Sequence, residues 1–274
     1  MKAITAIGIA GAFVLLLLSV LMEGGNPMAF FDIPALLIVV GGTTGATLAS
    51  TRASMLGVGV KALKIAIGGS SLDLKASIDR MVSLAERARR DGLLALEDDV
   101  RDLPDPFAQK GVQLIVDGAD SELVQSILHA EIDGMAERHA HVAGVFATAG
   151  GFAPTLGILG TVMSLVHVLE NLDSPSSLGH SIAGAFIATL YGVGSANLIF
   201  LPISNKLKEL SGEELAYREM LVSAILSIQA GDNPRLLREK LETYLDPTVR
   251  GAQASAPDGP AQPAASGEPE VATV

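Results

Sequence analysis

The sequence predicts an all-α integral membrane protein with four transmembrane helices and a helical cytoplasmic domain between the second and third. Charged residues make up only 18% of the 274 residues and hydrophobic ones 49%, whereas about a quarter of a soluble domain is charged. Four windows contain no Asp, Glu, Lys or Arg, and each is long enough to cross a bilayer, which takes roughly 20 apolar residues. No alternating strand pattern persists between them.

Net charge and cysteine content exclude other classes of protein. The formal charge of −11 argues against a nucleic-acid-binding protein, because such proteins usually present a basic face. The chain has no cysteine, which excludes a disulfide framework, a thiol nucleophile and a thiolate metal site.

The four expected spans cover residues 3–22, 33–51, 142–169 and 178–205. Lys2 followed by an apolar run also resembles a signal peptide. However, the segment Leu21-Met22-Glu23-Gly24 lacks the small residues of a cleavage site, so we expect a retained span.

The distribution of basic residues predicts the orientation of these spans. All 19 Lys and Arg residues lie in three places: at Lys2, within residues 52–138, and after residue 205. The two short loops, residues 23–32 and 170–179, contain acidic residues but no basic one. By the positive-inside rule, both termini and the large middle segment are expected to be cytoplasmic.

The cytoplasmic segments are expected to be helical. Ile78, Met81, Val82 and Ala85 recur at helical spacing, and Gly92 ends that pattern. Short helices are expected over residues 93–103 and 107–116, and a long one, capped by Asp120 or Ser121, continues into the third span.

The helix of the fourth span is expected to continue beyond the membrane to about residue 228. Asn233 and Pro234 then form the start signal of a last helix. The expected organisation is two spans in residues 1–52, a cytoplasmic helical domain in 53–141 and two further spans in 142–205. Cytoplasmic C-terminal helices follow in 206–250, and a disordered tail rich in Ala, Pro, Gly and Ser in 251–274.

The absence of charge inside the spans predicts a partner. A protein that moves protons or cations alone usually needs an intramembrane carboxylate. His167 and His180 lie at span ends, where we expect them at the membrane interface. If ions pass here, another chain must supply the carboxylate.

Prolines, hydroxyls and small residues within the spans are candidate functional groups. Pro154 and Pro202 are expected to kink their helices. Thr161 and Thr189 either bond to a carbonyl one turn earlier or line an ion path. Small residues recur in spans three and four and favour close helix packing, either within one chain or between subunits: Gly150, Gly151, Gly157, Gly160, Gly184, Ala188, Gly192 and Ala196.

Two catalytic or metal-binding alternatives are disfavoured. His139 and His141 belong to one expected helix, and residues two apart on a helix point about 200° away from each other, so no metal site is expected. Ser164 and His167 share a helix face, but nothing else supports a hydrolase, and we expect no enzyme activity and no cofactor.

Three motifs resemble the MotA/PomA type of flagellar stator A subunit, within the MotA/TolQ/ExbB proton channel family. They are Ala-Pro-Thr-Leu-Gly-Ile-Leu-Gly-Thr-Val at 153–162, Ala-Thr-Leu-Tyr-Gly at 188–192 followed by Leu201-Pro202, and Arg-Arg-Asp-Gly-Leu-Leu-Ala-Leu-Glu from Arg89 to Glu97. With the span layout, the resemblance covers about residues 1–245. ExbB and TolQ share the third-span motif but have three spans, so an ExbB/TolQ-like energiser of another envelope process is the alternative.

The resemblance implies a stator role in the bacterial inner membrane. Such A subunits form a ring, thought to be a homopentamer, around a dimeric MotB/PomB-type B subunit whose Asp carries the ion, and their cytoplasmic domain drives the rotor protein FliG. It implies that Arg89 and Glu97 face the rotor, in a role that the flanking Arg90 and Arg87 could share, although their charge pattern alone equally fits an ordinary solvated helix face. It also implies that Pro154 and Pro202 are hinges and that Thr161 and Thr189 line the ion path.

The coupling ion is expected to be H⁺ or Na⁺. Sodium-type relatives often have two adjacent threonines in span four, whereas Ala188 precedes Thr189 here. This departure favours protons, although Thr161 is a potential Na⁺ ligand.

Overall fold

The computed structural model describes residues 4–51, 62–66, 72–170 and 175–245, and these residues are helical with no β-strand. Four helices are long and apolar enough to cross a membrane, which confirms the predicted fold class. The expected tail, residues 251–274, lies outside the described residues.

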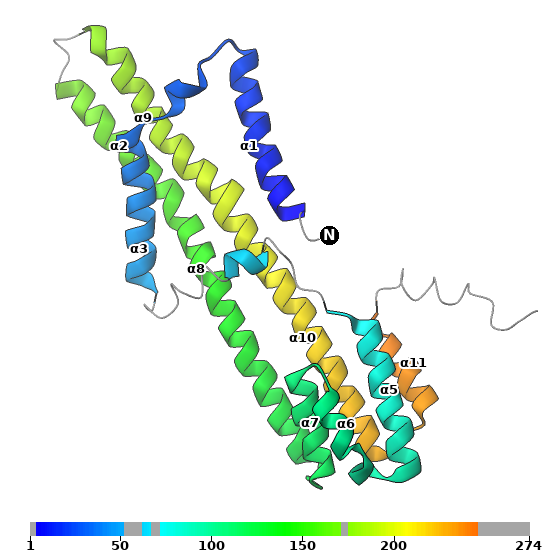
Figure 1. The fold of residues 1–274 in the computed structure, drawn as a ribbon. Coiled ribbons are helices and arrows are strands. Elements are labelled where there is room, and N and C mark those ends of the chain that lie inside the picture. Colours follow the sequence, from blue (N-terminus) through cyan, green and yellow to red (C-terminus); the bar gives the residue numbers. More distant parts are fainter. Residues whose placement is uncertain (1–3, 52–61, 67–71, 171–174, 246–274) are drawn as a thin grey trace, which may run out of the picture.

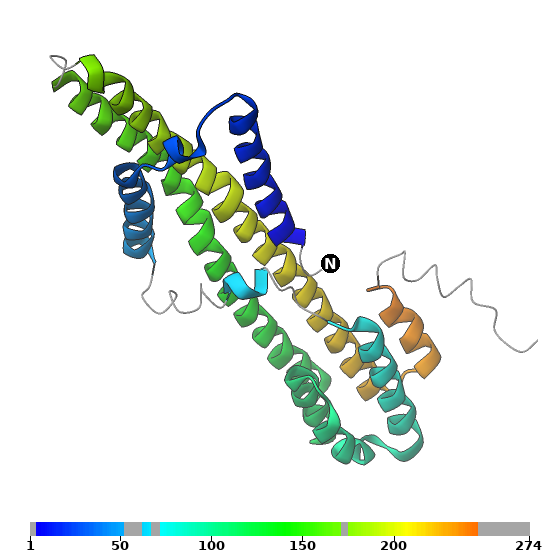
Figure 2. The ribbon, with the colours of Figure 1, turned by 45° about the horizontal axis from the view of Figure 1, so that its top comes forward.

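Two long antiparallel rods form the axis of the molecule (Figures 1 and 2). The first is α8, Ser121–Glu170, whose 50 residues extend about 75 Å at 1.5 Å per residue. The second comprises α9, Pro175–Ser195, the π-helical turn η4, Ala196–Phe200, and α10, Leu201–Ala230. Both rods are therefore much longer than the roughly 30 Å hydrocarbon core of a bilayer.

The first two spans flank the upper half of these rods, and the first meets them only near its lower end (Figure 1). The first is α1, Ile4–Met22, whose side chains are largely exposed. The second is continuous but changes pitch, with α2, Ile33–Leu36, the π-helical turn η2, Leu37–Gly41, and α3, Gly42–Ser50. A short 3₁₀ turn, η1, Pro27–Phe30, connects the two spans.

The lower half of the rods is surrounded by short helices. They are α5, Leu74–Asp91, the 3₁₀ turn η3, Leu93–Leu96, α6, Glu97–Asp102, α7, Pro106–Val116, and α11, Pro234–Glu242. The single short helix expected over residues 93–103 is thus a 3₁₀ turn followed by one α-helical segment. Gly92 separates it from α5 with φ of +86°, a conformation that side chains other than glycine rarely adopt.

Side-chain caps start α8 and α11 as the sequence predicts. Asp120 Oδ1 accepts a hydrogen bond from the amide of Leu123 at 2.9 Å, which decides between the two expected caps of α8. Asn233 Oδ1 accepts from the amide of Arg235 at 3.0 Å and starts α11 after the expected residue.

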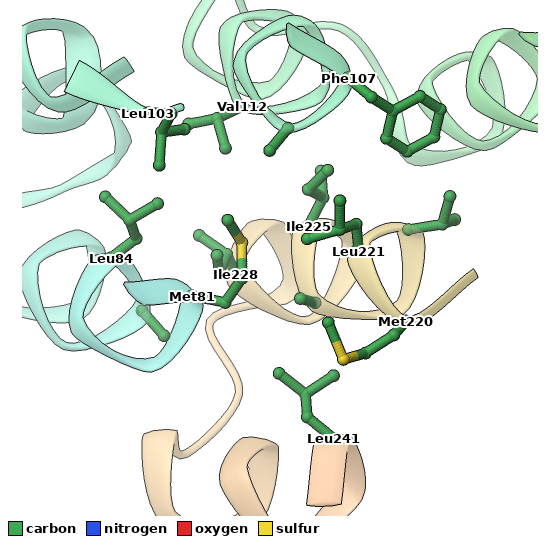
Figure 3. Packing of buried hydrophobic residues seen from close by; sticks show 14 of the residues in the cluster. Met81, Leu84, Leu103, Phe107, Val112, Met220, Leu221, Ile225, Ile228 and Leu241 are labelled. Atoms are coloured by element: carbon green, nitrogen blue, oxygen red, sulfur yellow. The ribbon is translucent and has the colours of Figure 1, made fainter. Parts of the chain in front are cut away.

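A hydrophobic core joins the short helices to the rods (Figure 3). Met81 and Leu84 of α5, Val112 of α7 and Leu241 of α11 converge on α10 there, as Figure 3 shows. The face predicted for α5 is confirmed, because Ile78, Met81, Val82 and Ala85 are all buried. This core fixes one body around the C-terminal half of α10.

Candidate functional site

The close approach of α8 and α9 creates the membrane-embedded part of the site. A methyl group at Gly157 would lie 2.8 Å from the carbonyl oxygen of Ala188, and one at Gly192 would lie 2.5 Å from that of Ala153. No real Cβ atom fits at such distances. The small residues therefore serve packing within this chain at these positions, one of the two roles that the sequence left open.

Two threonine hydroxyls meet one turn further toward the outer end of this contact. Thr161 Oγ1 lies 2.8 Å from the carbonyl oxygen of Ala185 and 3.1 Å from that of Gly157. It also shares a short hydrogen bond with Thr189 Oγ1. The single Thr161 proton thus has two acceptors within reach, the expected carbonyl one turn back and one across the two helices. Four oxygen atoms therefore cluster at a half-buried position inside the membrane.

The two prolines lie below this cluster, on opposite rods. Pro154 is inside α8, which remains a single helix on both sides of it. Pro202 occupies the first turn of α10, directly after the π-helical turn η4. Because proline has no N–H group, the preceding turn loses one regular hydrogen bond, and the wider π turn lies where that bond is missing.

A second polar contact connects α9 to the start of the second span, and it was not predicted from the sequence. The Tyr191 hydroxyl donates to the carbonyl of Phe30 and accepts from the amide of Asp32 at 3.3 Å. Asp32 Oδ1 in turn accepts from the amide of Ala35 at 2.8 Å and starts α2. Gly184 leaves room for the other carboxylate oxygen. Tyr191 belongs to a motif, but nothing in the sequence links it to a loop more than a hundred residues away.

The charged residues of the third motif form the tip of the cytoplasmic part. Arg89 and Arg90 end α5, Glu97 begins α6, and all three side chains are exposed. Among the described residues, Arg89 and Glu97 have no ion-pair partner, and Arg90 Nε contacts only its neighbour Asp91, at 3.2 Å.

Arg87 differs from the two arginines that follow it. Its Nη1 lies 2.5 Å from Asp99 Oδ1, and this pair connects α5 to α6 across the tip. Arg89, Arg90 and Glu97 are thus exposed on either side of the α5–α6 connection, while Arg87 is engaged within the chain.

The histidines expected to be poor metal ligands have other partners. His139 Nδ1 lies 3.2 Å from Ser211 Oγ, and His141 Nε2 lies 3.5 Å from Glu137 Oε1. The described part of the chain contains no group of three residues able to hold a metal ion.

Comparison with known proteins decides the family. Residues 99–220 match the MotA/TolQ/ExbB proton channel family. Motility protein A of Borreliella burgdorferi is 39% identical over 254 residues, which cover 91% of this chain and 96% of that protein. The chain belongs to the MotA/TolQ/ExbB proton channel family.

Other relatives of this family member support the same assignment. The chemotaxis protein PomA of Vibrio alginolyticus is 35% identical over 259 residues, 92% of this chain and 99% of that protein. The solved structure of C. jejuni MotAB superimposes with a TM-score of 0.85 at 30% identity, covering 89% of this chain and 95% of that one. The similarity thus includes the membrane helices and the cytoplasmic tip together.

Proposed function

We propose that this chain is the A subunit of a flagellar motor stator, which conducts ions together with a B subunit and converts their flow into torque on the rotor. The end-to-end similarity to motility A proteins and to a MotAB structure carries this proposal. It favours a stator over an ExbB/TolQ-like energiser, since the similarity extends over both the two N-terminal spans and the tip.

The distribution of charge explains why a B subunit is needed. The four spans contain no Asp, Glu, Lys or Arg, and a cation crossing the membrane usually needs such a group. The B subunit, of MotB/PomB type, supplies the carboxylate, and this chain supplies apolar surface for its helix. Exposed apolar side chains on α8 and α9 provide such surface: Ile158, Val162, Val166, Phe186, Leu190 and Val193.

In this proposal the two candidate sites have separate roles. Thr161 and Thr189 line the ion path, and the hinge prolines Pro154 and Pro202 allow the rods to bend as the ion site on the partner changes charge. Arg89, Arg90 and Glu97 contact the rotor protein FliG. The chain forms a homopentamer around the B-subunit helices, with both termini on the cytoplasmic side of the bacterial inner membrane.

The coupling ion is proposed to be H⁺, because Ala188 occupies the place of the first of two threonines found in sodium-type relatives. Swimming of cells that carry this chain and its B subunit should therefore persist when Na⁺ is withdrawn and fail when the proton gradient is collapsed.

Deletion of the gene tests the stator role itself. Cells without this chain should build flagella that do not rotate, and expression of the chain from a plasmid should restore rotation of tethered cells. An envelope defect with normal rotation would instead favour the ExbB/TolQ-like alternative.

A further inference from the structure

Two consecutive residues of α10 hold both ends of the segment that carries the tip charges. This segment starts at Ser77, in the first turn of α5, and ends at Asp105, which precedes α7. The Tyr217 and Ser77 hydroxyl oxygens lie 3.0 Å apart, and Arg218 Nη1 donates to Asp105 Oδ1 at 2.6 Å. Segment ends that are distant in sequence are thus attached to neighbouring positions on one rod.

The ion pair in this contact is shielded from water, unlike others of the cytoplasmic part. The side chains of Arg218 and Asp105 are 17% and 16% exposed, whereas those of Arg238 and Asp79, which connect α11 to α5, are 42% and 49% exposed. Exposed pairs contribute little to stability. Removing one partner of a largely buried pair is costly, because the other charge is left uncompensated.

The surroundings of Arg218 keep it charged and oriented. Burial acts to lower the pKa of its guanidinium, but the negative charges of Asp105 and Glu214 outweigh this effect and raise the pKa above its ordinary value. Nη2 donates to Glu214 at 3.2 Å, and the guanidinium stacks 5.0 Å from the ring centroid of Phe107. The planar fork therefore has a defined position on α10.

Asp105 transfers this orientation to the helix that follows. The same oxygen, Oδ1, also accepts from the amide of Phe107 at 2.8 Å and so caps α7. The direction in which α7 leaves the segment is therefore fixed relative to Arg218. On the other side, Tyr217 is 5% exposed, so its bond to Ser77 lies at the edge of the hydrophobic core.

Directional bonds add to the core here. Hydrophobic attraction itself is non-directional, whereas each of these two bonds connects one named position of α10 to one end of the segment. The rod formed by α9, η4 and α10 connects the fourth span directly to this body, beside α8 (Figure 1). The chain of the fourth span therefore continues without a break into the helix that carries Tyr217 and Arg218.

We propose that Tyr217 and Arg218 are positioning residues that couple the membrane rod to the rotor-facing tip, so that force on Arg89 and Glu97 is borne by α10. This inference rests on the proposed stator function. Neither residue belongs to the Thr161–Thr189 cluster or to the exposed charges of the tip. Loss of the contacts leaves the ion path intact but lets the tip yield under load.

Single-motor torque measured over a range of loads tests this inference. The full-length chain is expressed with its B subunit in cells lacking the native gene, as wild type, Tyr217→Phe and Arg218→Lys. Tyr217→Phe removes one hydroxyl, and Arg218→Lys keeps the charge but loses the fork. Arg238→Gln is the matched control, because it breaks the exposed pair on the same body.

The expected result is a loss of torque at high load for both variants, with speed at low load and the number of incorporated stator units unchanged, and wild-type torque for Arg238→Gln. Wild-type torque at every load would overturn the coupling role. A loss explained fully by fewer incorporated units would also overturn it, since that is a purely structural effect.

Two further outcomes have defined meanings. If Arg218→Lys does not accumulate in the membrane, Tyr217→Phe, the smaller change, decides between those results. If the wild-type chain itself produces no torque, the stator function fails and this inference fails with it, which is a different result from wild-type torque in all variants.

Discussion

Gly157 of α8 and Gly192 of α9 face each other backbone to backbone: a methyl group added at Gly192 would lie 3.0 Å from the Cα atom of Gly157. This contact allows the two rods to approach closely enough for the Thr161 and Thr189 hydroxyls to meet across them. The packing of glycines and the polar cluster are therefore parts of one arrangement.

The first prediction concerns this packing. Gly192→Ala should destabilise the folded protein by about 1–3 kcal/mol, because the helices must separate to admit the methyl group. The thermal midpoint of the purified protein in detergent measures this effect. Gly194→Ala is the matched control on the same helix, since a methyl group there would have no atom within 4 Å. Equal midpoints for the two variants would contradict the packing account.

A second prediction separates structural from ion-path roles of the hydroxyl pair. Thr161→Val keeps the shape of the side chain but removes its hydrogen bonds, which contribute about 0.5–1.5 kcal/mol each to stability. The protein should still fold, and swimming speed should fall. Thr161→Ser, which keeps the hydroxyl, should swim nearly normally. Normal swimming of Thr161→Val would limit the hydroxyl to local bonding within the helices.

The third prediction concerns the tip charges. The double variant Arg89→Glu/Arg90→Glu, or Glu97→Lys, should impair swimming while the protein level in the membrane stays unchanged. These side chains are exposed, and such substitutions usually shift stability by less than about 0.5 kcal/mol. Charges at an interface rim mainly steer association and fix register.

Arg87 should be left intact in that experiment, because it already pairs with Asp99 and its reversal would also change a contact within the tip. A compensating charge reversal on the rotor should restore part of the swimming. If the double variant swims with wild-type torque, the tip is an ordinary solvated surface.

A fourth prediction follows from the buried phenol of Tyr217. Burial raises its pKa above the ordinary 10.0; the Ser77 hydrogen bond opposes this and the charge of Asp105 adds to it. Between the pKa of the unfolded state, about 10.0, and the higher pKa of the folded state, only the folded protein retains the phenol proton. The stability that the neutral phenol contributes is therefore complete below pH 10.0 and is lost as the pH rises through the folded-state pKa.

Thermal midpoints measured from neutral pH to above pH 10.0 check this titration. The wild-type midpoint should fall more steeply in the alkaline range than that of Tyr217→Phe, which cannot ionise at this position. Parallel curves would show that the Tyr217 phenol titrates with the same pKa in the folded and unfolded states.

Local patterns were sufficient to predict much of the fold. The spans follow from uncharged windows, α5 from the spacing of Ile78, Met81 and Val82, and α11 from Asn233 followed by Pro234. The division at Leu93–Leu96 into a 3₁₀ turn was not predictable, because helical periodicity does not distinguish a short 3₁₀ turn from the start of an α-helix.

Contacts between distant segments could not be predicted from a single sequence. The motifs indicated Thr161 and Thr189 separately, but only the crossing of α8 and α9 shows that they share a hydrogen bond. Arg218 and Asp105 are typical surface residues by type. Their burial depends on how α7 packs on α10, and no local pattern records that packing.

Ion flux into reconstituted vesicles tests most directly whether this chain depends on a carboxylate from a partner. Vesicles would contain this chain alone, the chain with its B subunit, or the chain with a B subunit whose membrane-embedded Asp is changed to Asn. Because the four spans hold no charged residue, proton flux is expected only with the unaltered B subunit. Substantial flux through the chain alone, or through the complex with the altered B subunit, would contradict the account.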